Sequence, residues 1–110
     1  MAAPSHLDGT LTALAHATRR AILQRLSRGD ARVTDLAEPF DMSLNAVSKH
    51  VKVLERAGLV RRTQAGREHY IALDAAPIRR IASWAARYER FWSDRLDKLE
   101  AFLTTNRKRV

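Results

Sequence analysis

Residues 43–58 are the segment that most constrains how this chain folds. Ser43 belongs to the residue types that cap helix N-termini, and Gly58 suits the left-handed turn that ends a helix, so we expect a helix over 44–57. At 100° per residue its apolar side chains fall into one narrow stripe, made of Leu44, Val47, Val51 and Leu54. A helix with this pattern buries one side against a core.

The opposite side of this helix is polar and basic. It carries Asn45, Lys49, Lys52 and Arg56, with Ser48 and His50 on its flanks. An amide can hydrogen-bond a base edge at two points and cations can neutralise phosphates, so this face suits the major groove of DNA. The helix alone leaves a second interpretation open, which is an ordinary amphipathic helix with a solvated basic face.

The segment before the helix favours DNA binding. Residues 33–38 fit a short helix with Leu36 and Ala37 turned inward, and residues 39–42 fit a tight connection into Ser43. A short helix, a brief turn and a second helix with a polar outer face make the helix-turn-helix pattern.

The segment after the helix predicts a hairpin. Two strands are expected at 59–63 and 68–73, around a turn at 64–67 in which Gly66 supplies the positive φ that the turn needs. Three arginines are expected at or near its tip, namely Arg61, Arg62 and Arg67. The helix expected over 44–57 would be the recognition helix, called the reading helix below because it would read the base sequence. A basic hairpin directly after such a helix is typical of the wing of a winged helix-turn-helix.

Four segments within residues 11–73 carry a more specific pattern. They are LAHATRRAIL at 14–23, VTDLA at 33–37, SLNAVSKHVKVL at 43–54 and AGLV at 57–60. With these segments the chain resembles the ArsR-type winged-helix repressors, and the serine, histidine and leucine spacing of the third is among the more specific marks. The resemblance implies a homodimer that binds a palindromic operator and represses transcription.

The expected DNA contacts come from the reading helix and the hairpin. We expect Asn45 and Ser48 to discriminate bases and the cations to act mainly on the phosphate backbone. His50 is expected either to hydrogen-bond a phosphate or to be a half-buried packing residue. The whole candidate set is Ser43, Asn45, Ala46, Ser48, Lys49, His50, Lys52, Arg56, Arg61, Arg62 and Arg67.

Two helices ahead of this motif are expected to complete the core. The first, ending near 16–17, has three leucines on one face, Leu7, Leu11 and Leu14. Thr18 is expected to cap the second, which stops at Gly29 and turns Ile22, Leu23 and Leu26 inward. Its first turn holds Arg19 and Arg20, where cations oppose the helix dipole, so we expect acidic side chains as partners in preference to a phosphate.

The last helix is too apolar for one small domain to cover. Asp74 can cap it and Pro77 fits its first turn. Its stripe recurs at steps of three and four, through Ile78, Ile81, Ala85, Tyr88, Trp92, Leu96, Leu99 and Leu103, and is widened by Trp84, Phe91 and Phe102. Folding back over its own domain would need a break, and no internal glycine or proline supplies one.

We therefore expect a two-fold interface between two copies. The interface residues predicted for it are Leu7, Leu11, Leu14, Ile81, Trp84, Tyr88, Trp92, Leu96 and Leu99.

Length and charge agree with one small nucleic-acid-binding domain. At 110 residues the chain can bury one core but hardly two, and its net charge of +8 argues for a polyanionic partner. Residues 1–42 carry five basic and five acidic side chains, whereas 43–69 carry six and two, and 75–110 carry nine and four. The expected architecture is mainly α with a small β-hairpin, a single winged helix-turn-helix domain over 1–110, with the helix-turn-helix at 33–58, the wing at 59–73 and dimerisation helices at 5–17 and 75–104.

No metal or other cofactor is predicted. Cysteine is absent, which excludes thiol ligands, and the four histidines are far apart in sequence. By the resemblance, metal-sensing relatives use cysteines before the reading helix or acidic and histidine ligands on the last helix. Here that last helix offers Asp94, Asp97 and Glu100 without a histidine, a spacing that fits surface ion pairs better. The sequence identifies no small-molecule effector.

Enzyme motifs are absent as well, so we expect no catalysis. No signal peptide and no stretch of membrane-spanning length is visible, and the expected location is the cytoplasm without a membrane partner. Two other functions stay open, a winged-helix module that binds an acidic protein and an architectural DNA binder with little sequence preference. Asn45 and Ser48 favour sequence reading, since a purely electrostatic binder needs only cations.

Overall fold

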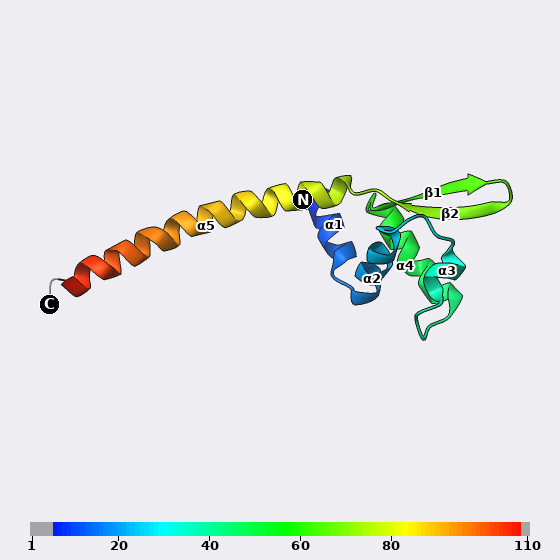
Figure 1. Cartoon of the computed structure of the whole chain (residues 1–110), viewed down its shortest axis with the longest axis horizontal. Coiled ribbons are helices and arrows are strands. Elements are labelled where there is room, and N and C mark those ends of the chain that lie inside the picture. Colours follow the sequence, from blue (N-terminus) through cyan, green and yellow to red (C-terminus); the bar gives the residue numbers. More distant parts are fainter. Residues whose placement is uncertain (1–5, 109–110) are drawn as a thin grey trace, which may run out of the picture. The chain divides into compact units, whose positions relative to one another are not determined.

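The computed structural model describes residues 6–108, and the side chains of 6–105. Its elements follow the order α1 (His6–Leu14), α2 (Ala17–Leu26), α3 (Val33–Ala37), α4 (Leu44–Arg56), β1 (Val60–Ala65), β2 (Glu68–Leu73) and α5 (Ala76–Lys108) (Figure 1). The predicted fold class, mainly α with one β-hairpin, is confirmed. Two compact units divide the chain, the first ending at Arg79 and the second beginning at Arg80.

Helix α4 begins and ends where its capping residues predict. The Ser43 hydroxyl accepts a hydrogen bond from the Ala46 N–H at 3.1 Å, and Gly58 follows the helix with a φ of 75°. Of the predicted apolar stripe, Val47, Val51 and Leu54 are fully buried. Leu44 is instead 49% exposed, which corrects the prediction for that residue.

Helices α2, α3 and α4 and the hairpin pack around one core in the first unit. The core side chains include Ile22, Leu23, Leu26, Leu36, Val47, Val51, Leu54, Leu59, Val60 and Ile71. The inward residues predicted for α2 are therefore confirmed, and so is Leu36 of α3, while Ala37 packs partly buried against the same core. This core holds the outer face of α4 in place.

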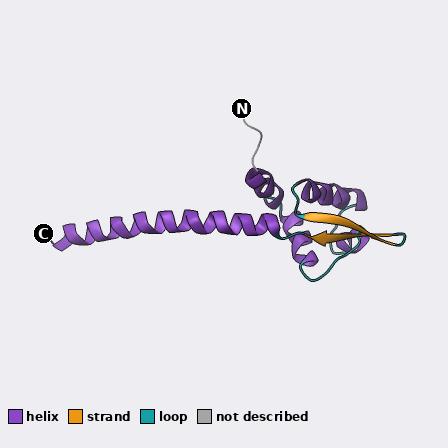
Figure 2. Ribbon diagram, turned by 90° about the horizontal axis from the view of Figure 1, so that it is seen from above, coloured by secondary structure: helices purple, strands orange, loops and turns teal. Residues whose placement is uncertain are grey.

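The hairpin is longer than predicted. Its pairs run from Val60 opposite Leu73 to Ala65 opposite Glu68, so that Gly66, with a φ of 65°, and Arg67 alone form the turn. Figure 2 shows the two strands side by side, joined by a short loop at one end. Ala31 adds a bridge to Ile71.

The tip of the hairpin therefore carries fewer arginines than expected. Arg61 lies opposite Ala72 and Arg62 opposite Ile71, near the base of the hairpin, so their predicted place at or near the tip is wrong. The two strands stay paired as far as Ala65, which leaves Arg67 as the arginine in the turn.

The first helix ends earlier than predicted and buries two residues other than its leucines. Helix α1 ends at Leu14, and the residues that it buries are Thr10 and Ala13, whereas Leu11 is 38% exposed and Leu14 packs partly against the core. The buried Thr10 hydroxyl donates to the His6 carbonyl at 2.8 Å, which satisfies it.

The cap of α2 is His16 and not Thr18. His16 has an extended backbone, and its Nδ1 accepts the Thr18 N–H at 3.1 Å. A histidine nitrogen thus replaces the oxygen expected of a capping residue. At the other end α2 stops at Leu26, three residues before Gly29.

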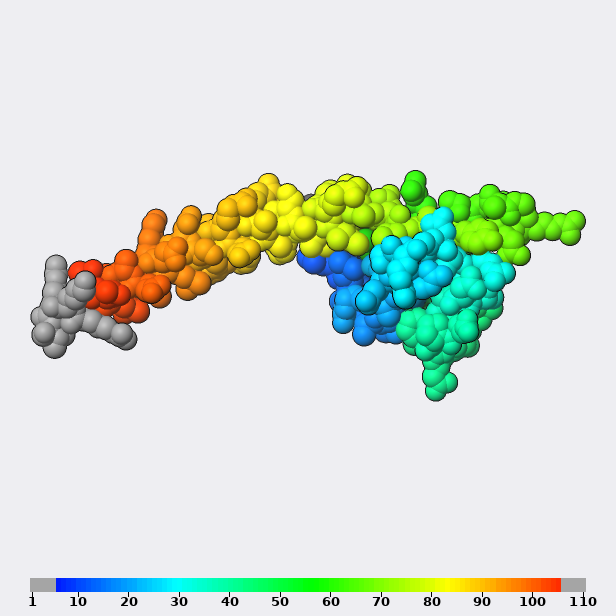
Figure 3. All heavy atoms as spheres, viewed as in Figure 1, coloured from blue at the N-terminus to red at the C-terminus, as the bar shows by residue number. Residues whose placement is uncertain are grey.

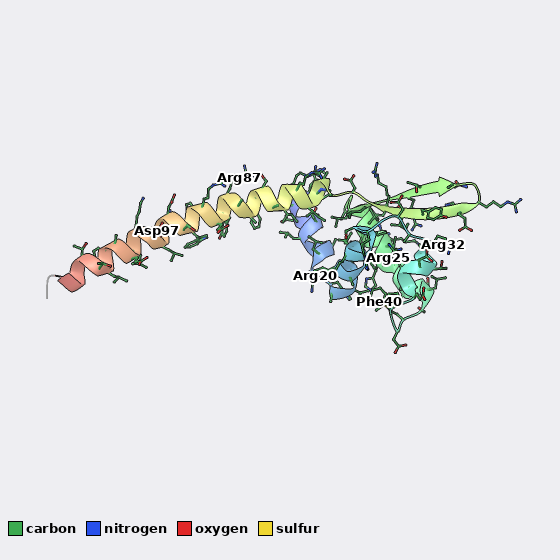
Figure 4. All side chains as sticks on the ribbon, viewed as in Figure 1. Arg20, Arg25, Arg32, Phe40, Arg87 and Asp97 are labelled. Atoms are coloured by element: carbon green, nitrogen blue, oxygen red, sulfur yellow. The ribbon has the colours of Figure 1, made fainter. Side chains whose placement is uncertain are left out.

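Arg19 and Arg20 bond to backbone carbonyls, not to the acidic side chains expected. The Arg20 Nη1 donates to the Leu14 carbonyl at 2.7 Å, and Arg19 donates to the carbonyls of Ala13 and Thr12 (Figure 4 labels Arg20). The last carbonyls of a helix lack partners within the helix, so the end of α1 supplies acceptors for both arginines.

Helix α5 is one unbroken helix of 33 residues, four longer at its C-terminus than predicted. The Asp74 carboxylate accepts the Ala76 N–H at 3.0 Å, as its capping role predicts. In the second unit eight large apolar side chains of α5 are 37–60% exposed, namely Trp84, Tyr88, Phe91, Trp92, Leu96, Leu99, Phe102 and Leu103, while Ile81 is half-buried. Within residues 6–108, none of the helices combines the length and the hydrophobicity that a membrane span requires.

Candidate nucleic-acid interface

The outer face of α4 offers the polar side chains that the sequence placed there. Asn45, Lys49, Lys52 and Arg56 are exposed, as is the capping Ser43, while Ala46, Ser48 and His50 are half-buried at its edges. The core residues Val47, Val51 and Leu54 fix the rotation of the helix about its axis, because each is fully buried. The predicted amide, hydroxyl and cations therefore lie on one surface.

The hairpin extends this surface. Figure 3 shows its tip, in light green, projecting from the body of the first unit. Arg61 and Arg67 are exposed, and no ion pair to either is found within residues 6–105. A projecting strand pair with a cation at its tip can reach a phosphate backbone beside the groove that holds the reading helix.

Arg62 differs from the other wing arginines because it is paired. Its Nε lies 3.1 Å from a Glu55 carboxylate oxygen on α4. Both side chains are half exposed, so water screens this pair and it contributes little to stability. It does offset the charge that Arg62 was expected to offer to DNA.

A cleft of about 380 Å³ lies between the start of α4, α3 and the wing. It is lined by Arg32, Val33, Thr34, Leu44, Ser48, Arg67, Glu68 and His69. The exposed Leu44 lines this cleft and does not reach the core. Thr34 and His69 were not predicted as site residues, and no sequence spacing relates them, since only the packing of the wing against α3 brings them together.

Arg32, which lines this cleft and is labelled in Figure 4, forms ion pairs with two acidic residues. It lies 3.2 Å from Asp35 and 3.6 Å from Glu68 of the wing. The hydrogen bonds from the Arg32 side chain and backbone hold the pKa of Asp35 below its usual value. These contacts tie α3 to β2 and so support the cleft.

His50 is the candidate site residue whose surroundings differ most from expectation. Its ring lies 4.5 Å, centroid to centroid, from the ring of His16, and its Nδ1 lies 3.4 Å from the Arg19 Nη1. Burial of the ring, and then the nearby His16 and Arg19, lower the pKa of His50. Nothing in the spacing of the four histidines predicts that two of them are in contact.

The described residues hold no group of three or more histidine, cysteine, aspartate or glutamate side chains placed to bind one metal ion. Asp94, Asp97 and Glu100 are exposed on α5. The chemistry available on α4 and the hairpin is that of an amide, hydroxyls and cations, which together suit DNA.

The helix-turn-helix, the basic reading helix and the hairpin define a winged helix-turn-helix DNA-binding protein. A helix-turn-helix domain family matches residues 14–63. The HTH-type transcriptional regulator Rv2034 of Mycobacterium tuberculosis is 40% identical over 86 residues, which are 78% of each chain. Both matches are to helix-turn-helix proteins.

Solved structures agree with this assignment. The crystal structure of the ArsR family transcriptional regulator RHA00566 is 42% identical and covers 81% of this chain and 98% of its own, with a TM-score of 0.75. The fold is shared with Mb0332 of Mycobacterium bovis, which is described as a homodimeric winged helix-turn-helix DNA-binding domain. That match is 23% identical, covers 86% of this chain and 95% of Mb0332, and has a TM-score of 0.63. The chain therefore belongs to the ArsR family of transcriptional regulators, and the protein is a DNA-binding transcriptional regulator.

Proposed function

We propose that this regulator is a homodimeric repressor that reads a two-fold symmetric operator. In this proposal residues 33–58 form the helix-turn-helix, 59–73 the wing, and 5–17 with 75–104 the dimerisation helices of one functional domain. Each copy then supplies one α4 to a major groove. The two reading helices of such a dimer contact half-sites about one helical turn apart, roughly 34 Å.

The observation that carries this proposal is the exposed apolar stripe of α5. Eight large apolar side chains on it, from Trp84 to Leu103, are 37–60% exposed in the single chain. Contiguous apolar surface of this extent is typical of a protein interface. Leu11 of α1 is exposed too, as expected if α1 contributes to the same interface.

In this proposal a second copy of the chain covers the apolar stripe of α5. Identical chains most often associate about a two-fold axis, in which the same surface of each copy meets itself. Covering the stripe with its own symmetry mate needs no further partner, and it doubles the number of reading helices. The homodimer described for Mb0332 supports the same arrangement.

Within each half-site we assign different roles to the exposed side chains of α4 and the wing. Asn45 and Ser48 discriminate bases, because an amide and a hydroxyl match donor and acceptor patterns on base edges. Lys49, Lys52 and Arg67 act on phosphates, which positions the helix without reading sequence.

Selection of bound duplexes from a random pool tests this proposal. We expect the selected DNA to contain an inverted repeat, and sedimentation of the protein at micromolar concentration to show a dimer. Selected DNA without symmetry, or a monomer, would contradict it. Binding with no enrichment of any sequence would indicate an architectural DNA binder. A complete absence of DNA binding would indicate a protein-interaction module.

A further inference from the structure

One arginine joins three parts of the first unit. The Arg19 Nε donates to the Ala13 carbonyl at 2.7 Å, and its Nη2 donates to the Thr12 carbonyl at 3.2 Å, both at the end of α1. Its Nη1 faces the His50 Nδ1 on α4 at 3.4 Å. Arg19 itself belongs to α2, so a single guanidinium links the end of α1 to the reading helix.

This contact assigns the tautomer of His50. A guanidinium carries five N–H donors and no acceptor, so the Nδ1 that faces it must be the acceptor. A neutral imidazole has one N–H, and it therefore lies on Nε2. His50 thus has a hydrogen-bond donor at Nε2 without needing a positive charge.

His16 completes the surroundings of this ring. Its own Nδ1 accepts the Thr18 N–H, and its ring lies against that of His50. In the described part of the chain, His16 and Arg19 are the titratable or charged groups that change the pKa of His50, and both lower it. A proton on the His50 Nδ1 would meet the Arg19 N–H, which is a contact between two donors.

We propose that Arg19 is a positioning residue for DNA binding, which holds His50 as the Nε2–H tautomer so that this N–H donates to a phosphate oxygen of the operator. Arg19 touches no DNA in this arrangement and acts through His50. The inference rests on the proposed function, in which α4 lies against DNA. In this arrangement His50 donates to the phosphate as a neutral ring and needs no positive charge. Arg19, which is bonded to the end of α1, sets the direction of the His50 N–H.

Arg20 provides a matched control in the same turn of α2. It also donates to a carbonyl at the end of α1, that of Leu14 at 2.7 Å, and no contact with His50 is found among the described residues. Arg20→Met removes one cation and one hydrogen bond to the end of α1, whereas Arg19→Met removes one cation and two such bonds. A purely structural role for Arg19 predicts that neither variant changes the tautomer of His50.

The first test measures the protein without DNA. In nitrogen-15 NMR of the histidine rings, we expect wild-type His50 to carry hydrogen on Nε2 at pH 8. Arg19→Met should increase the fraction with hydrogen on Nδ1 and raise the pKa of His50, whereas Arg20→Met should change neither. A wild-type ring that carries hydrogen on Nδ1, or equal behaviour of the two variants, would overturn the assignment.

The second test measures affinity for selected and random duplexes. We expect Arg19→Met to weaken both by about tenfold, as the loss of one hydrogen bond to a charged group would do, and Arg20→Met by less than twofold. In a His50→Asn background Arg19→Met should have no further effect. His50→Gln, whose amide nitrogen can reach the place of Nε2, should bind more tightly than His50→Asn.

Equal losses for the two arginine variants, with normal wild-type binding, would overturn this inference alone. Additive losses for Arg19→Met and His50→Asn would overturn it as well. A wild-type protein that binds no DNA would overturn the proposed function together with it.

Discussion

The Arg62 guanidinium lies 3.1 Å from the Glu55 carboxylate and so joins the base of the wing to the reading helix. The charge of Arg62 is therefore partly offset before DNA is present. Arg67, in the turn of the hairpin, has no such ion pair within residues 6–105. Arg62 and Arg67 have the same predicted role from the sequence, but their electrostatic surroundings differ.

The two arginines are expected to differ in salt dependence. Arg67→Ala should weaken binding to all sequences alike and flatten the slope of log affinity against log salt by about one unit, because one phosphate contact is lost. Arg62→Ala should change the slope less, since Glu55 already neutralises part of its charge. Glu55→Gln frees Arg62 and should steepen the slope. Equal slopes for all three variants would contradict this view of the wing.

Asn45 is expected to contribute to specificity. Asn45→Ala should cost about 1–3 kcal/mol on the selected operator and little on random DNA, because the loss is that of a base contact. Lys52→Ala is the control, and should weaken binding to both kinds of DNA similarly. Competition binding with the two duplexes measures the difference. Equal losses for Asn45→Ala on both would remove it from base reading.

Dimerisation is expected to depend on one side of α5. Leu99→Lys places a charge in the exposed apolar stripe and should shift the protein toward monomer in sedimentation, with a loss of operator affinity. Ala101→Lys adds the same charge two residues away, outside the stripe, and serves as its control. A dimer that survives Leu99→Lys unchanged would place the interface elsewhere.

The free energy of unfolding should depend on pH through His50. Its pKa in the folded protein lies below the unfolded value of about 6.5, so the unfolded chain binds this proton more readily. The contribution of His50 to stability is thus complete well above pH 6.5 and falls as the pH drops through 6.5 toward the folded pKa. Urea unfolding at pH 8, 7, 6 and 5 measures this loss. His50→Gln should reduce the pH dependence, and an unchanged profile in that variant would contradict the assignment.

The Ser43 cap should contribute measurably to stability. Ser43→Ala removes the acceptor of the Ala46 N–H and should lower the free energy of unfolding by about 1 kcal/mol, whereas Ser43→Gly should cost only a few tenths. Thermal and urea unfolding of the two variants test this. Similar values for both would mean that the hydroxyl is not the stabilising group.

Elements with local signals could be predicted from the sequence alone. For α4, Ser43, Gly58 and the spacing of Val47, Val51 and Leu54 predicted the bounds and the buried side, because capping and periodicity depend on neighbours within a few turns. The same reasoning identified the basic face and the wing. The same reasoning wrongly assigned the cap of α2 to Thr18, whereas the cap is His16. The residue at which the chain leaves α1 and enters α2 depends on how the two helices pack, which local signals do not encode.

Tertiary structure decided what covers each face and which side chains meet. Periodicity places Leu44 on the apolar stripe of α4 and Leu11 on the leucine face of α1. The exposure of each side chain, however, depends on the segments that pack beside its helix. Arg19 and His50 are 31 residues apart in sequence, yet their nitrogens are 3.4 Å apart. The partners of Arg62 and His50 are likewise set by the packing of α1, α2, α4 and the hairpin around one core, which fixes distances between segments that local backbone preferences leave free.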